Sequence, residues 1–227
     1  MINWQTYWDK IARSSEDPHA QVARIQGKTP LTEKQLRRIA LHIVGQLDLR
    51  PHYTLLDVCC GNGTLTRLLA EKCSTTTGVD ISPEQIRRAK THSKALSITY
   101  QVADATQLTS HVEGTFDRIN LYFSFQYLDS YSKGRAAIRE MAKLLKPGGK
   151  IFIGDVPDAA KLPVFYPSLI ARIRYKISHL LGRHPMGKFW KEAEIQKICR
   201  EVGLSCVTLA QPGDLPYAVY RVDYVIF

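Results

Sequence analysis

Residues 55–64 read Leu-Leu-Asp-Val-Cys-Cys-Gly-Asn-Gly-Thr, and this stretch decides the fold class of the chain. Tyr53 to Val58 predicts a short buried strand, and Gly63 to Lys72 has the apolar periodicity of a helix. Glycines between a strand and a helix let the backbone pass close to a ligand, and the helix N-terminus offers free N–H groups to it. The stretch therefore predicts a ligand-binding turn at the carboxyl end of a strand.

Strands and helices alternate on both sides of this turn, from about Tyr53 to Asp155. Further strands are predicted over 75–80, 98–102, 116–121 and 150–154, and helices are predicted over 132–145 and from Ser82 to about Lys94. Lys146-Pro147-Gly148-Gly149 is a helix stop before the last of these strands. Alternation with short connections predicts a parallel sheet covered by helices on both faces.

The turn at 57–64 matches neither of two common nucleotide motifs. A dinucleotide fingerprint needs a third small residue at position 66, where Thr66 stands. A phosphate loop needs Gly-Lys-Ser/Thr, which the sequence lacks. Both a nicotinamide site and a nucleoside-triphosphate site are therefore disfavoured.

Carboxylates follow the second and third predicted strands. Asp80 ends the second strand, where a carboxylate can accept hydrogen bonds from both hydroxyls of a ribose. Asp104 follows the third strand, where it can accept one from the exocyclic amine of a base. Because parallel strands end at one edge of a sheet, the glycine turn and both acids are expected to meet there.

These motifs together resemble those of the class I S-adenosylmethionine-dependent methyltransferases. Residues 55–63 resemble the first motif, D-x-G-x-G-x-G, with Cys59 standing where glycine is commonest. Four further stretches resemble the later motifs in order and spacing: 78–82, 103–105, 116–119 and 144–150. The resemblance covers residues 53–155. No Asn-Pro-Pro-Tyr or Asp-Pro-Pro-Tyr follows the fourth strand, which disfavours amino-purine or glutamine methylation.

The resemblance implies an α/β fold with a Rossmann-like seven-stranded sheet. The implied strand order is 3-2-1-4-5-7-6, with strand seven antiparallel, and the implied cofactor is S-adenosyl-L-methionine, with S-adenosyl-L-homocysteine as product. Tyr7 and Trp8 are predicted either to fold over the cofactor or to pack on the core. The predicted cofactor-binding residues are Tyr7, Asp57, Cys59, Gly61, Asn62, Gly63, Asp80, Ile81, Asp104, Ala105 and Leu121.

We expect one methyltransferase domain over residues 1–227. Residues 1–50 are predicted to form an N-terminal helical cap, with helices over about 4–13 and 33–47. Residues 51–156 are the predicted cofactor-binding core and 157–200 a basic helical cap insertion. Residues 201–227 are predicted to supply terminal strands over 206–209 and 217–227.

Positive charge gathers in residues 161–200. The net charge is +10, and this segment has nine Lys or Arg residues against Glu192 and Glu194. Such a field favours anionic partners, which leaves a phosphorylated small molecule, an anionic lipid surface and nucleic acid as alternatives to a merely solvated face. Residues 162–181 are amphipathic, so they are predicted to form a lid, a cap helix with its basic residues outward, or a peripheral membrane contact.

Cysteine content bears on location. The five cysteines are an odd number, and Cys59 and Cys60 are adjacent, which favours a reducing cytoplasm over a disulfide framework. The N-terminus lacks the pattern of a signal peptide, and no stretch has the length of a membrane span. No Cys/His cluster has zinc spacing, so no metal is expected.

The residues that would bind the methyl acceptor belong to the least patterned parts of the chain. His184 and Asp155 are candidate bases, although an amine acceptor needs none. The predicted substrate-binding residues are Phe125, Gln126, Arg172, Lys176 and His184. The leading hypothesis is methylation of an O or N atom of a small molecule, anionic or a natural-product intermediate. The alternatives are an RNA methyltransferase and a non-catalytic cofactor-binding regulatory module; oligomeric state is left open.

Overall fold

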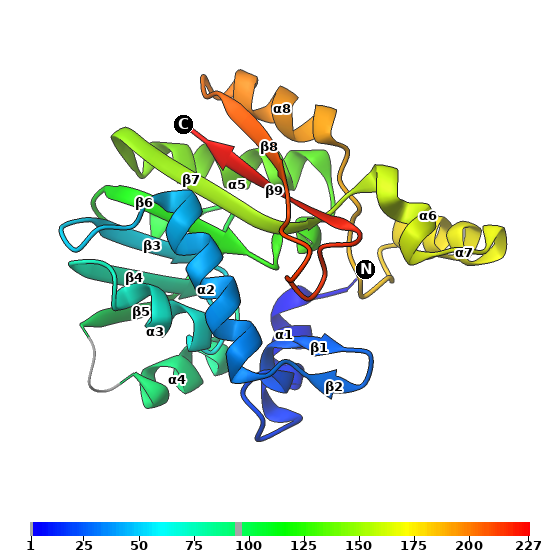
Figure 1. Cartoon of the computed structure of the whole chain (residues 1–227), viewed down its shortest axis with the longest axis horizontal. Helices are drawn as coiled ribbons and strands as arrows, with labels where there is room; N and C mark the ends of the chain where they lie inside the picture. Colours follow the sequence, from blue (N-terminus) through cyan, green and yellow to red (C-terminus); the bar gives the residue numbers. More distant parts are fainter. Residues whose placement is uncertain (1, 94–96) are drawn as a thin grey trace.

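The computed structural model describes residues 2–93 and 97–227, and its centre is a seven-stranded sheet (Figure 1). The strands are β3 (Thr54–Val58), β4 (Thr75–Asp80), β5 (Ile98–Val102), β6 (Phe116–Tyr122), β7 (Leu145–Pro157), β8 (Cys206–Ala210) and β9 (Arg221–Ile226). Their order is β5-β4-β3-β6-β7-β9-β8, and β9 pairs antiparallel with both neighbours. The predicted order 3-2-1-4-5-7-6 with an antiparallel seventh strand is confirmed.

Helices cover both faces of the sheet. On one face, α5 (Tyr131–Lys143) and α8 (Glu192–Glu201) bury apolar side chains against β3, β6 and β7. On the other face, α2 (Glu33–Leu47) and α3 (Thr64–Ala70) do the same. Leu55 and Leu56 belong to different faces because successive side chains of a strand alternate. A fifth helix, α4 (Pro83–His92), packs on Tyr100 of β5, and its predicted end near Lys94 lies outside the described residues.

The N-terminal segment lies at the carboxyl edge of the parallel strands. It contains α1 (Trp4–Arg13), η1 (Ala20–Val22) and a small hairpin of β1 (Ile25–Gln26) and β2 (Thr29–Pro30). Asp9 of α1 accepts hydrogen bonds from the Ser82 hydroxyl and from the Glu84 N–H, 3.2 Å away, at the start of α4. At its other end, the Ile2 N–H donates to the Gly182 carbonyl at 2.7 Å. These bonds hold α1 across the edge of the sheet.

The predicted helix over 162–181 is two helices in the structure. After η4 (Ala159–Lys161), α6 (Leu162–Phe165) ends before Pro167, and α7 (Leu169–Leu180) begins after Ser168. Proline disfavours helical geometry at the residue before it, and Tyr166 has φ −116° and ψ 85°. The Ser168 hydroxyl then accepts the Ala171 N–H at 3.1 Å and caps α7. The break turns α7 away from the body of the molecule (Figure 1).

Other boundaries differ less. β7 is longer than the predicted 150–154 strand because Leu145 already pairs with Phe116, ahead of a register shift. The connections between β6 and α5 and between β8 and β9 hold η3 (Phe125–Tyr127) and an irregular loop, respectively; η2 (Leu108–Ser110) follows β5. In the described part of the chain, no helix combines the length and apolarity that crossing a bilayer requires.

Candidate functional site

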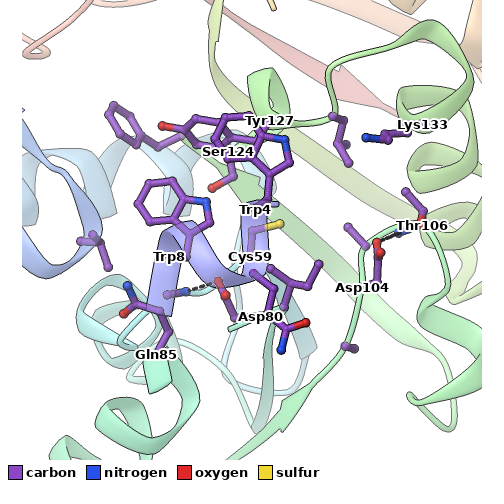
Figure 2. A pocket seen from close by; sticks show the side chains of 18 of the residues that line it. Trp4, Trp8, Cys59, Asp80, Gln85, Asp104, Thr106, Ser124, Tyr127 and Lys133 are labelled. Atoms are coloured by element: carbon purple, nitrogen blue, oxygen red, sulfur yellow. Dashed lines mark hydrogen bonds between the residues drawn. The ribbon is translucent and has the colours of Figure 1, made fainter. Parts of the chain in front are cut away.

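A pocket of about 350 Å³ lies at the carboxyl ends of β3, β4, β5 and β6. This volume is within the usual range for small-molecule sites. Parallel strands present their carboxyl ends together, which is why residues distant in sequence line one cavity (Figure 2). Six predicted cofactor-binding residues line it: Cys59, Gly61, Asp80, Ile81, Asp104 and Ala105.

Asp80 is held by backbone donors at the end of β4. One carboxylate oxygen accepts the Gly61 N–H and the other the Ser82 N–H, each at 2.9 Å. Burial raises the pKa of Asp80 to about 6, against the lowering effect of these bonds. Each oxygen keeps a lone pair for a further donor, so the carboxylate can accept two hydroxyl groups side by side.

Asp104 is fixed in a similar way after β5. Its Oδ1 accepts from the Thr106 N–H and the Thr106 hydroxyl, both at 2.8 Å. No hydrogen bond from any residue in 2–93 or 97–227 reaches Oδ2. The free oxygen of a partly exposed carboxylate that lines the pocket can accept from an amine of a ligand.

The turn after β3 requires unusual backbone geometry. Gly61 has φ +57°, and a Cβ there would lie 2.7 Å from Cγ1 of Val22, so only glycine fits. Cys59 has φ +58°, the left-handed region that favours glycine. This geometry explains why glycine is commonest at that place in the motif, and it makes Cys59 a strained residue. Burial raises the pKa of both the Cys59 and Cys60 thiols well above the ordinary value.

Two more strand ends share this strain. Phe123, directly after β6, has φ +66°, and Asp155 of β7 has φ +61°. Non-glycine residues in this region cost about 1–3 kcal/mol each and persist where surrounding structure fixes them. Three neighbouring strands, β3, β6 and β7, thus place a strained residue at the same edge of the sheet.

Arg24 is the main pocket residue that motif reasoning missed. It lines the pocket at 6% exposure, and its guanidinium donates to the Thr64 hydroxyl at 2.7 Å. It forms no salt bridge with a residue that the structure describes. Burial lowers its pKa, with Asp57 acting in the opposite direction. A buried cation without an ion pair, facing a cavity, is a binding group for an anion.

Aromatic side chains close the pocket above the acids. Trp4 and Trp8 of α1 line it together with Tyr127, and their rings pack on Tyr127 with centroids 4.8 and 5.0 Å away (Figure 2). Tyr7 packs edge-on against both indoles but does not line the cavity. Of the predicted aromatic pair, the structure brings Trp8 to the pocket and leaves Tyr7 behind it. Gln85, Thr106 and Lys133 also line it, without any motif to reveal them.

Four predicted cofactor-binding residues lie behind the pocket wall. Asp57 is buried and accepts hydrogen bonds from Thr66 and from Asn120. Burial raises its pKa. The remaining three support the turn or the core: the Asn62 amide donates to Pro18 and Gln21, Gly63 caps α3 at φ +74°, and Leu121 is fully buried in β6. They shape the turn and do not reach the cavity.

The predicted substrate residues do not gather at this pocket. Phe125 is fully buried against Trp190, and Gln126 is buried with its amide donating to the Phe123 carbonyl at 2.9 Å. Arg172 and Lys176 lie on α7 and line neither described pocket. Sequence periodicity placed them on a helix but could not say where that helix docks.

The two candidate bases occupy different surroundings. Asp155 is 1% exposed, lies 3.1 Å from the Arg221 guanidinium, and lines neither described pocket. Burial raises its pKa to about 6, while Arg221 acts in the opposite direction. His184 lines a second pocket of about 160 Å³, whose wall includes Trp4. Trp4 lines both cavities, so His184 borders a cavity that adjoins the first pocket. Burial lowers the His184 pKa.

Among the residues that the structure describes, no group of three or more His, Cys, Asp or Glu side chains has the arrangement to hold a metal ion.

Comparison with known proteins identifies methyltransferases among the relatives of this chain. A family model described as a methyltransferase domain matches residues 55–149. The chain is 33% identical over 155 residues to a ubiquinone biosynthesis O-methyltransferase of Xanthomonas euvesicatoria pv. vesicatoria (strain 85-10), covering 66% of this chain and 62% of that protein. A protein of the same description from Chromobacterium violaceum is 27% identical over 165 residues, covering 71% and 68%. The chain thus spans less than two thirds of the Xanthomonas relative.

Solved structures share the fold over nearly the whole chain. Magnesium protoporphyrin IX methyltransferase from Synechocystis PCC 6803, with bound S-adenosylmethionine, has a TM-score of 0.67 at 17% identity, covering 100% of this chain and 97% of that chain. N-methyltransferase NodS from Bradyrhizobium japonicum WM9, in complex with S-adenosylhomocysteine, has a TM-score of 0.66 at 20% identity, covering 99% and 98%. At these identities the likeness shows a shared fold.

Proposed function

Because this chain belongs to the class I S-adenosylmethionine-dependent methyltransferases, we propose that it transfers a methyl group from S-adenosylmethionine to an oxygen or nitrogen atom of a small molecule. The observation that carries the proposal is the arrangement of three charged groups around one pocket. Asp80, Asp104 and Arg24 line it from three separate elements of the chain.

These groups match the polar ends of the cofactor in chemistry. Asp80, with both oxygens already on backbone donors, would accept the two ribose hydroxyls. Asp104 would accept from the adenine amine through its free Oδ2, and Arg24 would donate to the methionine carboxylate. The absence of a Cβ on Gly61 lets Val22 pack against the turn, and both residues line the pocket beside Asp80. The described residues therefore fit the cofactor.

The chemistry comes from the cofactor and the geometry from the protein. When bound, S-adenosylmethionine supplies a methyl group on a sulfonium, which is activated for in-line displacement by a nucleophile. The protein's residues orient both reactants and exclude water, and Trp4, Trp8 and Tyr127 supply the apolar cover for that purpose. This division of labour needs no nucleophilic side chain in the site.

We assign the acceptor to the space between the two pockets. Trp4 is the residue common to their walls, and His184 lies on the far side. The Tyr166 hydroxyl lies 3.3 Å from His184 Nε2, and His184 Nδ1 accepts the Met186 N–H at 3.2 Å. The bond to Nδ1 places the proton of a neutral imidazole on Nε2, so His184 would act as a base only after its ring or Met186 shifts. Asp155 is assigned to the buried pair with Arg221.

The relatives guide the choice of acceptors. Those from Xanthomonas and Chromobacterium are described as O-methyltransferases of ubiquinone biosynthesis, which favours phenolic hydroxyl acceptors for a first screen. The location we propose is the cytoplasm, on the strength of the five cysteines, all of which are free thiols.

Isothermal titration with S-adenosylmethionine, S-adenosylhomocysteine and NAD tests the cofactor. We expect binding of both adenosyl compounds and none of NAD. Transfer of a radiolabelled methyl group to phenolic and amine acceptors then tests the reaction. Failure to bind either adenosyl compound would refute the proposal, and tight binding without transfer to any acceptor class would favour a regulatory module.

A further inference from the structure

Helix α7 presents an apolar stripe to the outside of the molecule. At about 100° per residue, the stripe covers an arc of roughly 100° around the helix. Tyr175, on the opposite side, is the buried anchor of the helix. The stripe consists of Leu169, Ile170, Ile173, Ile177 and Leu180, which are 48–87% exposed. The cap-helix hypothesis expected basic residues outward; Arg174 and Lys176 are exposed, and the aliphatic face is exposed beside them.

Cations flank the stripe on both edges. By the same angular count, Arg172 and Lys176 lie along one edge and Arg174 along the other. None of these three forms a salt bridge with any residue in the described ranges. The chain has no acid between Ala159 and Lys191, so nothing on the helix or its connections offsets this charge.

An aliphatic stripe of this size on a projecting helix is costly to leave in water. Contiguous exposed apolar surface marks an interaction site. A helix with aliphatic side chains on one face and Lys/Arg beside them has the composition of an interfacial helix, which lies in the plane of a membrane surface. Helix α7 has 12 residues and cannot span a bilayer, which leaves the in-plane orientation.

Charge decides between the available occupants. A second copy would bring two positive faces together across a symmetric contact, which like-charge repulsion disfavours. Nucleic acid would suit the cations but not the stripe, because bases stack on aromatic side chains and the stripe has none. An anionic lipid surface satisfies both features at once.

We propose that α7 docks this chain on an anionic lipid bilayer, with the aliphatic stripe at the headgroup–acyl boundary and the flanking cations on lipid headgroups. The inference does not rest on the proposed reaction, because it follows from exposure and charge alone. It predicts a reversible, salt-sensitive association and no insertion across the membrane.

Co-sedimentation with sucrose-loaded vesicles tests the proposal. The vesicles consist of phosphatidylcholine alone or of phosphatidylcholine and phosphatidylglycerol in equal parts, at low and high salt. One variant combines Ile170→Ser, Ile173→Ser and Ile177→Ser, and the other combines Arg174→Gln and Lys176→Gln. The matched controls are Leu41→Ser with Val219→Ser, which are 63% and 71% exposed, and Lys34→Gln with Lys90→Gln, also exposed.

We expect the wild type to sediment with the anionic vesicles and to be released by salt. Loss of the two cations should lower partitioning about 25-fold, since each cation near the surface contributes about fivefold, or about 1 kcal/mol. The triple serine variant should lose at least ~10-fold because three aliphatic side chains leave the lipid. Both control pairs should bind like the wild type, and unchanged melting temperatures should show that all variants are folded.

Three results would overturn the inference. The first is no sedimentation with anionic vesicles, and the second is binding that the stripe and cation variants leave intact. The third is a dimer in analytical ultracentrifugation that the triple serine variant dissociates, without vesicle binding, since the stripe would then be a contact between copies.

Discussion

Arg24 gives the sharpest test of how the pocket binds its ligand. Its guanidinium is buried, lines the cavity and has Thr64 as its hydrogen-bond partner, without an ion pair among the described residues. The change is Arg24→Met, which keeps much of the side-chain volume and removes the charge. If the guanidinium binds the methionine carboxylate, the variant should lose affinity for ligands that contain this group and for no others.

The expected magnitude follows from the contacts. Hydrogen bonds to a charged group contribute about 1.5–3 kcal/mol each, so losing one charge-assisted contact should raise the Kd for S-adenosylhomocysteine roughly 10- to 150-fold. Methylthioadenosine has the same ribose and adenine but no carboxylate. Its Kd should change less than about threefold, because Asp80 and Asp104 remain in place.

The ligand-free protein provides an independent readout. Removing the Thr64 hydrogen bond costs about 1.5 kcal/mol or more, while removing a buried, unpaired charge relieves a penalty of several kcal/mol. The free energy of unfolding of ligand-free Arg24→Met should therefore equal or exceed that of the wild type. Saturating S-adenosylhomocysteine stabilises the wild type by about 2.7 kcal/mol at 100 times its Kd, and it should stabilise the variant much less at the same concentration.

Calorimetry with both ligands and denaturant unfolding without ligand complete the experiment. Equal losses of affinity for S-adenosylhomocysteine and methylthioadenosine would mean that Arg24 supports the turn after β3 and does not bind the carboxylate. A ligand-free variant less stable by several kcal/mol would show that the guanidinium has a structural partner, and the reasoning would fail.

Three further predictions concern the pocket. Burial raises the pKa of Asp80 to about 6, so the carboxylate takes up a proton as the pH falls through 6. In calorimetry, the Kd of the wild type for S-adenosylhomocysteine should therefore rise below that pH. In Asp80→Asn the binding should be weaker and its Kd should not change with pH. Gly61→Ala should lower the free energy of unfolding by ~1–3 kcal/mol and abolish cofactor binding. The control is Gly114→Ala, at φ +83° with open space around its Cβ, which should lose only stability. Similar losses of binding in both variants would contradict the steric argument. His184→Gln should lower kcat without changing the Kd of the cofactor, and an unchanged kcat would remove His184 as the base. Burial lowers the His184 pKa, so the imidazole becomes protonated only below pH 6.5, and wild-type turnover should fall below that pH.

Local motifs made the sheet and its edge predictable. The strand–helix alternation and the acids at 80 and 104 are short-range patterns, and the handedness and connection rules of parallel sheets convert them into a topology. The pocket positions of Asp80 and Asp104 followed because a strand end fixes where the next residue stands.

Contacts between segments that are distant along the chain could not be predicted from the sequence. Arg24 and Trp4 reach the pocket from the N-terminal segment, in which no sequence motif marks them as pocket residues. In the sequence Asp155 is a carboxylate at the end of a predicted strand, and its partners Arg221 and Asp223 lie 66 and 68 residues further along the chain. On α7, periodicity shows that an apolar stripe exists but not which way it faces, since that depends on where Tyr175 docks.

Helix α1 lies over the pocket, so its opening can set the rate at which ligands enter and leave. Trp4 and Trp8 cover the cavity, and α1 is tied at one end to Gly182 and at the other to the start of α4 through Asp9. If ligands exchange beneath α1, these bonds must open, and α1 then holds a spent cofactor longer than its affinity alone implies. The maximum turnover rate would then equal the rate at which α1 opens, whatever the reactivity of the acceptor.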